Sequence, residues 1–524
     1  MASKPDTKKD TVAQTGLRRL LNNLKAFPRN VWWSMVRQGR PQSPRAQSES
    51  VFNNLFLHIH PVRVHRWTLK KSFTLGLGVA TTALFAILTI TGVLLMVYYK
   101  PTTAEAYHSV KDIHHVVLGG RLLRNVHRWA AHLMVVTVFL HMARVFLTCS
   151  YRKPREFNWL IGIGLLVLTL ALSFTGYCLP WDQLGYWATV IGSNIAGSTR
   201  ELLDVLRPSA SSGSGDLLRE TMLGSRQIGD DAILRFYWLH CILLPLLMVL
   251  LIALHFWRIR KDGGMSRPDT IRPEELKSIP KDEIAEESFA DEEKTYTLMA
   301  VMPGKTASVG QGPKDTVRSW PHLFRAEIAV FMLVLAVVVF LGVFFDAPLK
   351  EPADPKVPEN PAKAPWYFLG VQELVSYSAF SGGFIIPLVA ILALASIPFL
   401  DREGRASGRW PAGREARWLG ISCAFIAVLV VGLLAFLVNF GWLRNWIVTI
   451  SQLWVILFNP GTILVAASLI FSLLVVKWTG STRLGAMAVF CCFFVAYVLL
   501  TYFATIHRGP NWDFYWWPSQ WPRY

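Results

Sequence analysis

The sequence predicts an all-α membrane protein with about nine transmembrane helices. Of its 524 residues, 52% are hydrophobic and only 17% are charged, and the mean hydropathy is +0.34. Apolar runs long enough to cross a bilayer recur along the chain, and clusters of Lys and Arg follow every second run. This composition excludes a disordered, fibrous or disulfide-rich protein, and it argues against an ordinary soluble enzyme.

Each span is identified by its length. The hydrocarbon core of a bilayer is about 30 Å thick and needs about 20 apolar residues of helix. Runs of this kind predict spans near residues 74–99, 125–147, 158–180, 234–257, 325–346, 376–399, 417–440, 461–478 and 484–506. Residues 445–458 are apolar but shorter, and they end at Asn459-Pro460-Gly461, so we expect an interfacial or re-entrant segment there.

The basic clusters predict which side of the membrane each loop occupies. Lys and Arg gather after the spans that end near residues 147, 257, 399 and 478, and the N-terminal segment is basic as well. Basic loops stay on the cytoplasmic side. We therefore expect a bacterial inner-membrane protein with a cytoplasmic N-terminus and an external C-terminus. The net charge of +18 then reflects basic residues that gather at the cytoplasmic membrane surface, and we expect no nucleic-acid partner.

Two polar stretches border the first four spans. Residues 1–70 form a basic surface segment, and one helical face within it carries Leu17, Leu20, Leu21 and Leu24. Such a helix is expected to lie on an anionic lipid surface, and a solvated basic tail is the alternative. Residues 262–322 are rich in Asp and Glu over their first half and form a flexible cytoplasmic linker after the unit at 71–261.

Four histidines lie inside predicted spans and form two matching pairs. His127 and His141 are 14 residues apart in one span, and His240 and His255 are 15 apart in another. Fourteen residues of helix rise about 21 Å in nearly four turns, so each pair lies near one helix face. An imidazole inside a bilayer is costly without a partner, and neutral imidazole is a common axial ligand of haem iron. The pairs predict two non-covalent bis-histidine haems b, whereas taken singly each histidine is more often an ordinary hydrogen-bonded residue.

Span order predicts which histidines share a haem. Both spans run from the outer to the inner face, so His127 pairs with His240 near the outside and His141 with His255 near the inside. The chain contains no C-x-x-C-H sequence, so it is not expected to attach a c-type haem by that route.

Glycines and arginines recur beside these histidines. Two glycine pairs are each spaced by 14 residues, namely Gly78 with Gly92 and Gly162 with Gly176. Glycine is unfavourable in a helix unless something must approach closely, which a porphyrin edge would do; small-residue helix packing is the alternative. Haem propionates would need counter-charges, which are expected from Arg124, Arg128 and Arg144. Simple interfacial snorkelling is the alternative for each arginine.

These residues stand in strings that resemble cytochrome b of the quinol:cytochrome c and quinol:plastocyanin oxidoreductases. The matching strings include RNVHRWAAH (124–132), FLHMARVFL (139–147), TGYCLPWDQLGYW (175–187) and HFWRIRK (255–261). The resemblance is dense over about 55–261, where it implies a di-haem four-helix bundle. It is weaker over 323–402, which is similar to the following subunit of the plastid complex and is fused here. Residues 403–524 match partly or not at all and are expected to add further transmembrane helices.

The resemblance also implies the quinone sites. Gly176, Tyr177, Pro180 and Trp181 would help to form the quinol-oxidising site on the outer side. Trp366 and Tyr367 would join them, and Arg260 matches an arginine near the inner quinone site. The haem held by His127 and His240 would be the low-potential one, and the other the high-potential one.

Two departures from the family pattern stand out. The Pro-Glu-Trp-Tyr motif is replaced by Ala364-Pro365-Trp366-Tyr367, so the glutamate thought to take a quinol proton is missing. Glu373 is the nearest carboxylate in an apolar stretch and is the expected substitute; a charge without a catalytic role is the alternative. Gly76 stands where the plastid branch has a cysteine that fixes a third haem, so that bond cannot form, and a non-covalent third haem stays open.

The resemblance implies a cytochrome b subunit that oxidises quinol outside and reduces quinone inside. The expected partners are a Rieske iron–sulfur protein and a cytochrome c-type acceptor, both on separate chains, within a larger complex that is a homodimer. A non-bifurcating, quinone-binding di-haem anchor is the alternative. A di-haem reductase fed by NADPH and FAD is disfavoured because no GxGxxG sequence follows a predicted strand.

Overall fold

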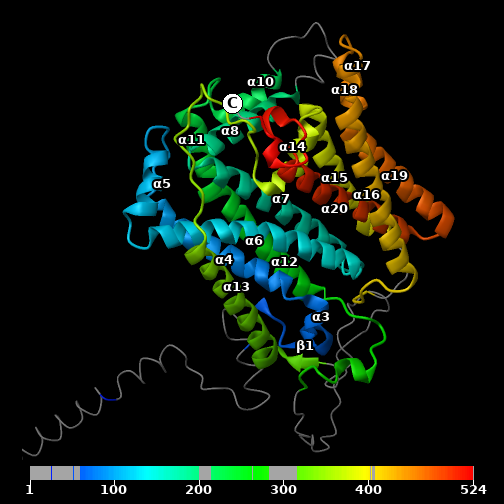
Figure 1. The fold of residues 1–524 in the computed structure, drawn as a ribbon. Coiled ribbons are helices and arrows are strands. Elements are labelled where there is room, and N and C mark those ends of the chain that lie inside the picture. Colours follow the sequence, from blue (N-terminus) through cyan, green and yellow to red (C-terminus); the bar gives the residue numbers. More distant parts are fainter. Residues whose placement is uncertain are drawn as a thin grey trace, which may run out of the picture.

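A computed structural model describes residues 25, 51, 59–199, 214–262, 264–281, 316–401, 403 and 407–522. Within these residues, nine helices are long and apolar enough to cross a membrane. They are α4 (Leu77–Met96), α6 (Gly120–Leu147), α7 (Glu156–Cys178), the continuous α11–η3–α12 (Asp230–Lys261), α13 (Phe324–Phe344), η6–α15 (Ser381–Leu400), α16 (Arg414–Phe440), α19 (Pro460–Thr479) and α20 (Thr482–Ile506). Each corresponds to one predicted span, which confirms the all-α membrane fold (Figure 1).

The first five spans form one packed unit. Helix α4 packs on α6, α7 packs on α12, and α13 covers both α4 and α6. Their shared core contains Leu84, Val126, Met134, Met248 and Val338. The four histidine-bearing and glycine-bearing helices therefore lie together, as a four-helix bundle requires.

The last three spans pack against this unit through α20. Helices α16 and α19 pack on α20, and the short helix α14 (Trp366–Val375) packs on it as well. Phe490 of α20 stacks on Phe146 of α6 with ring centroids 3.9 Å apart, and Tyr497 stacks on Phe139 at 5.2 Å. The C-terminal helices thus bury one face of α6, and α20 also packs against α14.

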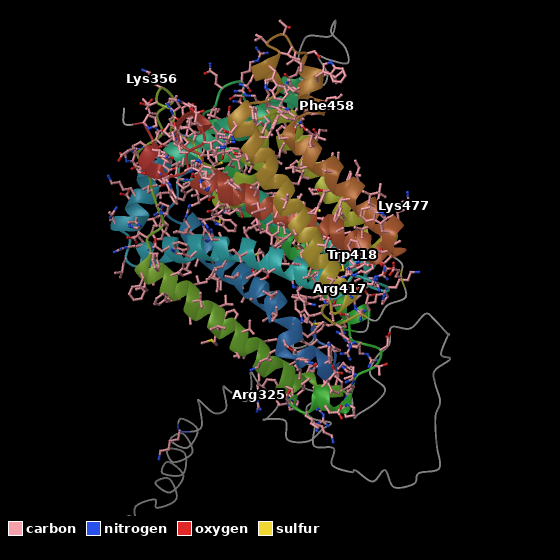
Figure 2. The ribbon with its side chains drawn as sticks, turned by 45° about the vertical axis from the view of Figure 1, so that its right-hand side comes forward. Arg325, Lys356, Arg417, Trp418, Phe458 and Lys477 are labelled. Carbon is pink, nitrogen blue, oxygen red and sulfur yellow. The ribbon has the colours of Figure 1, made fainter. Side chains whose placement is uncertain are left out.

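The ends of the spans form two opposite faces. The α14 face carries α5 (Ala106–His115), α8 (Gln183–Gly197), α10 (Ser214–Leu223), α14, and the described C-terminal residues with η7 (Pro510–Trp512) and η8 (Pro518–Gln520). The β1 face carries β1 (Arg63–His65), η2 (Arg66–Leu69), α3 (Lys71–Thr74), η4 (Pro273–Leu276), β2 (Thr316–Arg318) and η5 (Ser319–Leu323). Figure 2 shows Arg325, Arg417 and Lys477 at helix ends toward the β1 face, and Lys356 and Phe458 on the other side.

The predicted linker at 262–322 is described only at its ends, and both ends are packed rather than free. Leu276 and Ile279 are buried against Trp67 and Phe73. Strand β2 pairs antiparallel with β1, with Val317 opposite Val64. The expectation of flexibility is therefore wrong for these ends, because their apolar residues find partners in the segment just before α4. The leucine-bearing helix predicted within residues 1–45 lies outside the described residues.

Two short helices follow α16 on the α14 face, where an interfacial segment was expected. They are α17 (Leu443–Trp446) and α18 (Gln452–Leu457). Trp446, Trp454 and Phe458 are about half exposed. The side-chain oxygen of Asn459 then accepts a hydrogen bond from Thr462 N and begins α19.

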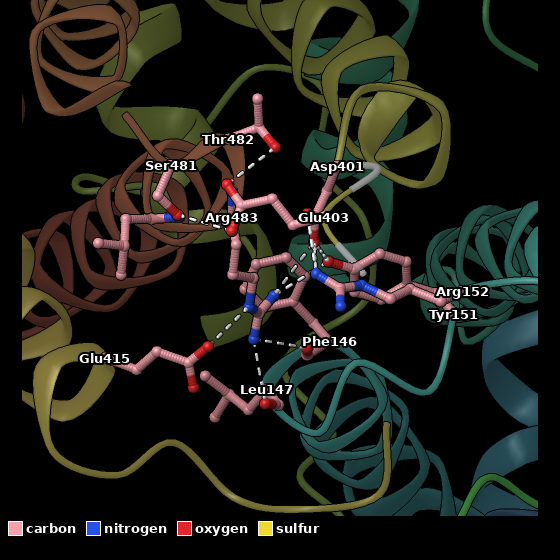
Figure 3. A network of polar contacts seen from close by, with 11 residues as sticks. Phe146, Leu147, Tyr151, Arg152, Asp401, Glu403, Glu415, Ser481, Thr482 and Arg483 are labelled. Atoms are coloured by element: carbon pink, nitrogen blue, oxygen red, sulfur yellow. Dashed lines mark hydrogen bonds and ion pairs between the residues drawn. The ribbon is translucent and has the colours of Figure 1, made fainter. Parts of the chain in front are cut away.

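A buried network of charged side chains fastens the C-terminal spans to α6 on the β1 face (Figure 3). Arg483 of α20 is 1% exposed, and it donates hydrogen bonds to the Tyr151 hydroxyl at 3.0 Å and to two carbonyl oxygens at the end of α6. Asp401 accepts hydrogen bonds from the Tyr151 hydroxyl and from Arg152. Glu415 of α16 lies 3.7 Å from Arg483. A buried guanidinium is tolerated here because carboxylates and carbonyl oxygens surround it.

Candidate functional site

The outer histidine pair faces across the bundle. His127 of α6 and His240 at the start of η3 (Leu239–Leu243) have ring centroids 6.3 Å apart. Two metal–nitrogen bonds of about 2 Å, together with the half-widths of two imidazole rings, span about 6 Å. The pair is therefore spaced to hold one iron between its rings.

Hydrogen bonds fix the orientation of both rings. The Thr91 hydroxyl donates to Ile87 O at 2.7 Å, so its oxygen is left to accept from His127 Nδ1 at 2.8 Å. His240 Nδ1 lies 3.1 Å from the carbonyl oxygen of Leu172, which can only accept. Both rings then carry their hydrogen on Nδ1, which leaves Nε2 as the free donor atom for a metal.

The inner pair lies toward the β1 face. His141 of α6 and His255 of α12 form this pair, and both residues are partly buried. Among the described residues, His141 Nδ1, His255 Nδ1 and the Nε of Arg144 are buried without a hydrogen-bond partner. Buried polar atoms are rarely left unpaired, and a haem propionate would offer the Arg144 guanidinium an acceptor. The donor set at both levels thus fits haem.

A π-helical turn explains the unequal spacing of the two pairs. Fourteen residues separate His127 and His141 in a regular helix, whereas 15 separate His240 and His255. The five residues of η3 form a π turn, which holds about one residue more than an α turn. The extra residue is absorbed there, so His255 keeps its place opposite His141.

Three of the four predicted glycines lie against histidine rings. A Cβ added at Gly92 would lie 3.2 Å from His127 Cε1, and one at Gly176 would lie 2.4 Å from His240 Cε1. A Cβ at Gly78 would lie 3.2 Å from His141 Cε1. The groups that approach these three glycines closely are therefore the imidazole rings. At Gly162 no atom lies within 4 Å of an added Cβ, so its expected contact with a porphyrin edge stays a prediction.

The three predicted propionate partners have different surroundings. Arg124 donates to the carbonyl oxygens of Ala347 and Pro348 at 2.8 and 2.6 Å. Arg128 lies 5.8 Å from the Tyr177 ring centroid. Arg144 lies over the Phe73 ring at 5.4 Å. Of the three, Arg144 is the best placed for an anionic group, because its buried Nε still needs an acceptor.

Several predicted quinol-site residues meet on the α14 face. Trp366 and Tyr367 begin α14, and their rings lie 6.4 and 5.8 Å from the ring of His132 on α6. The Trp366 indole N–H donates to His132 Nδ1 at 2.8 Å. Tyr177 ends α7 near Arg128. His132 was not predicted as a site residue, although it closes the RNVHRWAAH string that carries His127.

The loop that leads into α14 is held by polar contacts from α6 and α8. The Asn125 side chain donates to Gly342 O at 2.9 Å and accepts from Ala347 N at 2.8 Å. Asp182 accepts from Lys350 N at 3.0 Å, and Gln183 accepts from Asp354 N at 3.1 Å. These hydrogen bonds fix the path of residues 345–365, and this path determines where Trp366 and Tyr367 lie.

Trp181 belongs to a different cluster. It is 5% exposed and packs with Ala106 and Ile233. Pro180 precedes it and is partly buried. The indole of Trp181 is therefore largely covered by its own neighbours, and its expected contact with quinol stays a prediction.

Glu373 lies near the end of α14 and is fully buried. Its carboxylate accepts four hydrogen bonds. Arg508 donates two of them, at 3.0 and 2.5 Å, Trp512 Nε1 donates one at 3.0 Å, and the Tyr377 hydroxyl donates one at 3.1 Å. A carboxylate has about four acceptor positions. The predicted role as a proton acceptor would require one of these bonds to break.

Two further predicted positions lie toward the β1 face. Arg260 is exposed in the last turn of α12. Gly76 has a φ of +63°, and a Cβ added there would lie 3.0 Å from a Val330 methyl group of α13. The close packing of α13 gives this glycine a structural reason independent of any third haem.

Comparison with known proteins finds relatives of the part of the chain that carries the four histidines. Residues 66–263 match the family described as Cytochrome b/b6/petB. The chain is 44% identical to cytochrome b6 of Heliobacterium mobile over 204 residues, which are 39% of this chain and 88% of that one. It is 43% identical to cytochrome b6 of Synechocystis over 187 residues, which are 36% and 79% of the two chains.

A solved structure is similar over most of the length. A chain of a hyperthermophilic respiratory Complex III matches with a TM-score of 0.54 and 22% identity, and the match covers 92% of this chain and 97% of that one. At this identity the likeness concerns the fold alone. The family match at residues 66–263 contains the spans α4, α6 and α7 and the continuous α11–η3–α12. From that coverage and identity, the chain belongs to the cytochrome b/b6 family.

Proposed function

We propose that this chain is the membrane redox subunit of a quinol:cytochrome c oxidoreductase-type complex that holds two non-covalent bis-histidine haems b. As a member of the cytochrome b/b6 family, the chain is a multi-pass, haem-binding membrane protein of electron transport and the cytochrome b subunit of a quinol oxidoreductase.

The observation that carries the proposal is the outer histidine pair. Its 6.3 Å ring separation and its Nδ1 hydrogen bonds present two free Nε2 atoms to one iron. His141 and His255 form the second proposed pair about four turns away along α6, without hydrogen bonds at Nδ1 within the part of the chain that the structure describes. The two haems supply one-electron carriers at two depths of the membrane.

Quinol is oxidised at the α14 face, beside Trp366, Tyr367 and Tyr177. Aromatic rings stack on a quinone head group, and the phenolic hydroxyls can bond to its oxygens. One electron leaves to a Rieske iron–sulfur protein and then to a cytochrome c-type acceptor. The other crosses to a quinone site near Arg260 on the β1 face. Protons are released at the first site and taken up at the second.

The orientation is supported by charge. The exposed Arg and Lys side chains at helix ends on the β1 face, including Arg325, Arg417 and Lys477, fit a cytoplasmic side. The α14 face is then external, in a bacterial inner membrane. We also propose a homodimer within the larger complex.

Oxidant-induced reduction tests this function. The complex is purified with the full chain and given quinol, an inhibitor of the inner site and then a pulse of ferricyanide. A bifurcating enzyme transiently reduces haem b when the oxidant is added, because removal of one electron forces the other onto the haem. Haem b that is only oxidised by the pulse would contradict the proposal.

A non-bifurcating, quinone-binding di-haem anchor is the second candidate. The observation that favours it is Pro365, which stands at the position where the family motif carries its glutamate. The same pulse separates the two candidates, since an anchor shows no oxidant-induced reduction.

A further inference from the structure

A histidine outside both haem sites lies beside the proposed quinol site. His132 follows His127 by five residues of helix, which turns its side chain about 140° away from the haem side of α6. Its ring instead lies among Trp129, Trp366 and Tyr367, at centroid distances of 5.6, 6.4 and 5.8 Å. His132 is only partly buried, so part of its surface remains open to a ligand.

One hydrogen bond fixes which nitrogen of His132 carries the hydrogen. The Trp366 indole N–H lies 2.8 Å from Nδ1, and an indole can only donate. Nδ1 is therefore the acceptor, and the neutral ring carries its hydrogen on Nε2. His132 thus has an acceptor nitrogen, Nδ1, at the contact between α6 and α14. The indole N–H that it accepts from is a neutral donor, which a hydroxyl group can replace.

We propose that His132 binds the quinol head group and accepts one of its hydroxyl protons at Nδ1, in the position that the Trp366 indole occupies in this structure. The inference rests on the proposed function. In the step, an O–H bond of the quinol breaks and an N–H bond forms at Nδ1. The second hydroxyl proton goes to water at the α14 face. The two electrons go to the one-electron acceptors named above, the iron–sulfur protein and the outer haem.

The contacts favour His132 over Glu373 for this task. Glu373 is held by four hydrogen bonds, two of them from a guanidinium, and hydrogen bonds between charged groups are the stronger kind. His132 Nδ1 is held by one bond from a neutral indole, and the side chain of Trp366 is itself partly exposed. A quinol hydroxyl would have to displace only one neutral hydrogen bond at His132, but at Glu373 it would have to displace one of four.

Two substitutions of equal size separate proton uptake from a structural role. Glutamine and glutamate at position 132 both offer an oxygen that can accept the Trp366 N–H. A carboxylate can also take a proton, whereas the amide cannot. The experiment uses the purified complex with full-length H132Q, H132E or H60Q chains. His60 is the matched control, since it bonds Glu327 on the β1 face at 3.0 Å and has no part in either site.

The rate of haem b reduction is measured with a short-chain ubiquinol and, in parallel, a short-chain menaquinol, and haem content is measured by pyridine haemochrome. We expect two haems b in every variant, a rate at least tenfold lower in H132Q, a smaller loss in H132E, and no change in H60Q. A wild-type rate in H132Q would overturn the proposal. So would equal losses in H132Q and H132E, which indicate a structural role. E373Q is measured beside them, and a loss confined to E373Q would return the role to Glu373.

Failure of this inference differs from failure of the proposed function. If the unmodified complex does not reduce haem b with either quinol, the proposed function fails. If the unmodified complex does so and H132Q does so equally well, only the role of His132 is refuted.

Discussion

The indole nitrogen of Trp366 lies 2.8 Å from Nδ1 of His132, although 234 residues separate them in the sequence. His132 belongs to the region that matches cytochrome b6, and Trp366 to the region after it. The hydrogen bond therefore joins the haem-bearing helices to the fused second part of the chain. Any quinol site at this place is composite, and it depends on how α14 is held against α6.

Loss of one haem ligand should remove one haem and leave the other. His127→Ala deletes one side of the outer pair, whereas His141 and His255 keep their own positions about 21 Å away. We expect one haem b per chain by pyridine haemochrome and loss of one component from the redox titration. His108→Ala, at an exposed position of α5 outside the bundle, should retain both haems. Two haems in the His127 variant would refute the assignment.

The glycines near the histidines should differ in their tolerance of a methyl group. A Cβ at Gly176 would lie 2.4 Å from His240 Cε1, well inside contact distance, so Gly176→Ala should displace the ring and shift or abolish the outer haem signal. Nothing lies within 4 Å of an added Cβ at Gly162. Gly162→Ala is therefore the control for packing. If Gly162→Ala also perturbs the haem spectrum, a porphyrin edge occupies that position, as the sequence predicts.

The buried ion pair between Glu373 and Arg508 should matter for stability. Removing one partner leaves the other charge buried, which typically costs about 3–5 kcal/mol. Arg508→Gln should therefore lose its haem absorbance much faster than the unmodified protein at a fixed elevated temperature, the appropriate measure for irreversible unfolding. The exposed pair of Arg226 and Glu220 gives the control, because such pairs contribute about 0–1 kcal/mol. Equal half-lives for Arg508→Gln and Arg226→Gln would contradict this expectation.

The packed linker end on the β1 face should loosen in acid. The Arg409 guanidinium bonds to Glu275 at 2.8 and 2.9 Å and lowers the pKa of this carboxyl from 4.5 to about 2. Because the folded pKa is the lower one, the stabilisation is complete above about pH 4.5 and is lost as the pH falls toward 2. We expect hydrogen exchange in residues 264–281 to speed up, relative to its intrinsic rate, across this window. In Glu275→Gln that pH dependence should be absent, and its persistence would assign the effect to another group.

The sequence predicted the spans well because hydropathy is a local property. A run of 20 apolar residues must cross the bilayer whatever else the chain does, and all nine predicted spans are helices in the structure. The four histidines proposed as haem ligands could also be selected from the sequence, since two ligands on one helix must repeat at a helical interval.

The contacts at the proposed quinol site join residues far apart in the sequence, so they could not be predicted in this way. The partner of His132 comes from position 366, and the partners of Glu373 include Arg508 and Trp512. Only the packing of α20 against α6 and α14 brings these segments together. The linker shows the same limit, because Leu276 and Ile279 look like isolated apolar residues in a polar stretch until Trp67 and Phe73 cover them.

The π turn at Leu239–Leu243 has a consequence for how such chains can change over time. An inserted residue would normally rotate everything beyond it by about 100°, which would turn a ligand histidine away from its partner. When the insertion is taken up by one widened turn, the helix beyond Leu244 keeps its phase. The number of residues between the two histidines of this helix can then change by one while both histidines keep their positions in the bundle. Deleting Cys241 should accordingly restore a regular helix with both histidines still facing α6, whereas a deletion in the middle of α12 should not.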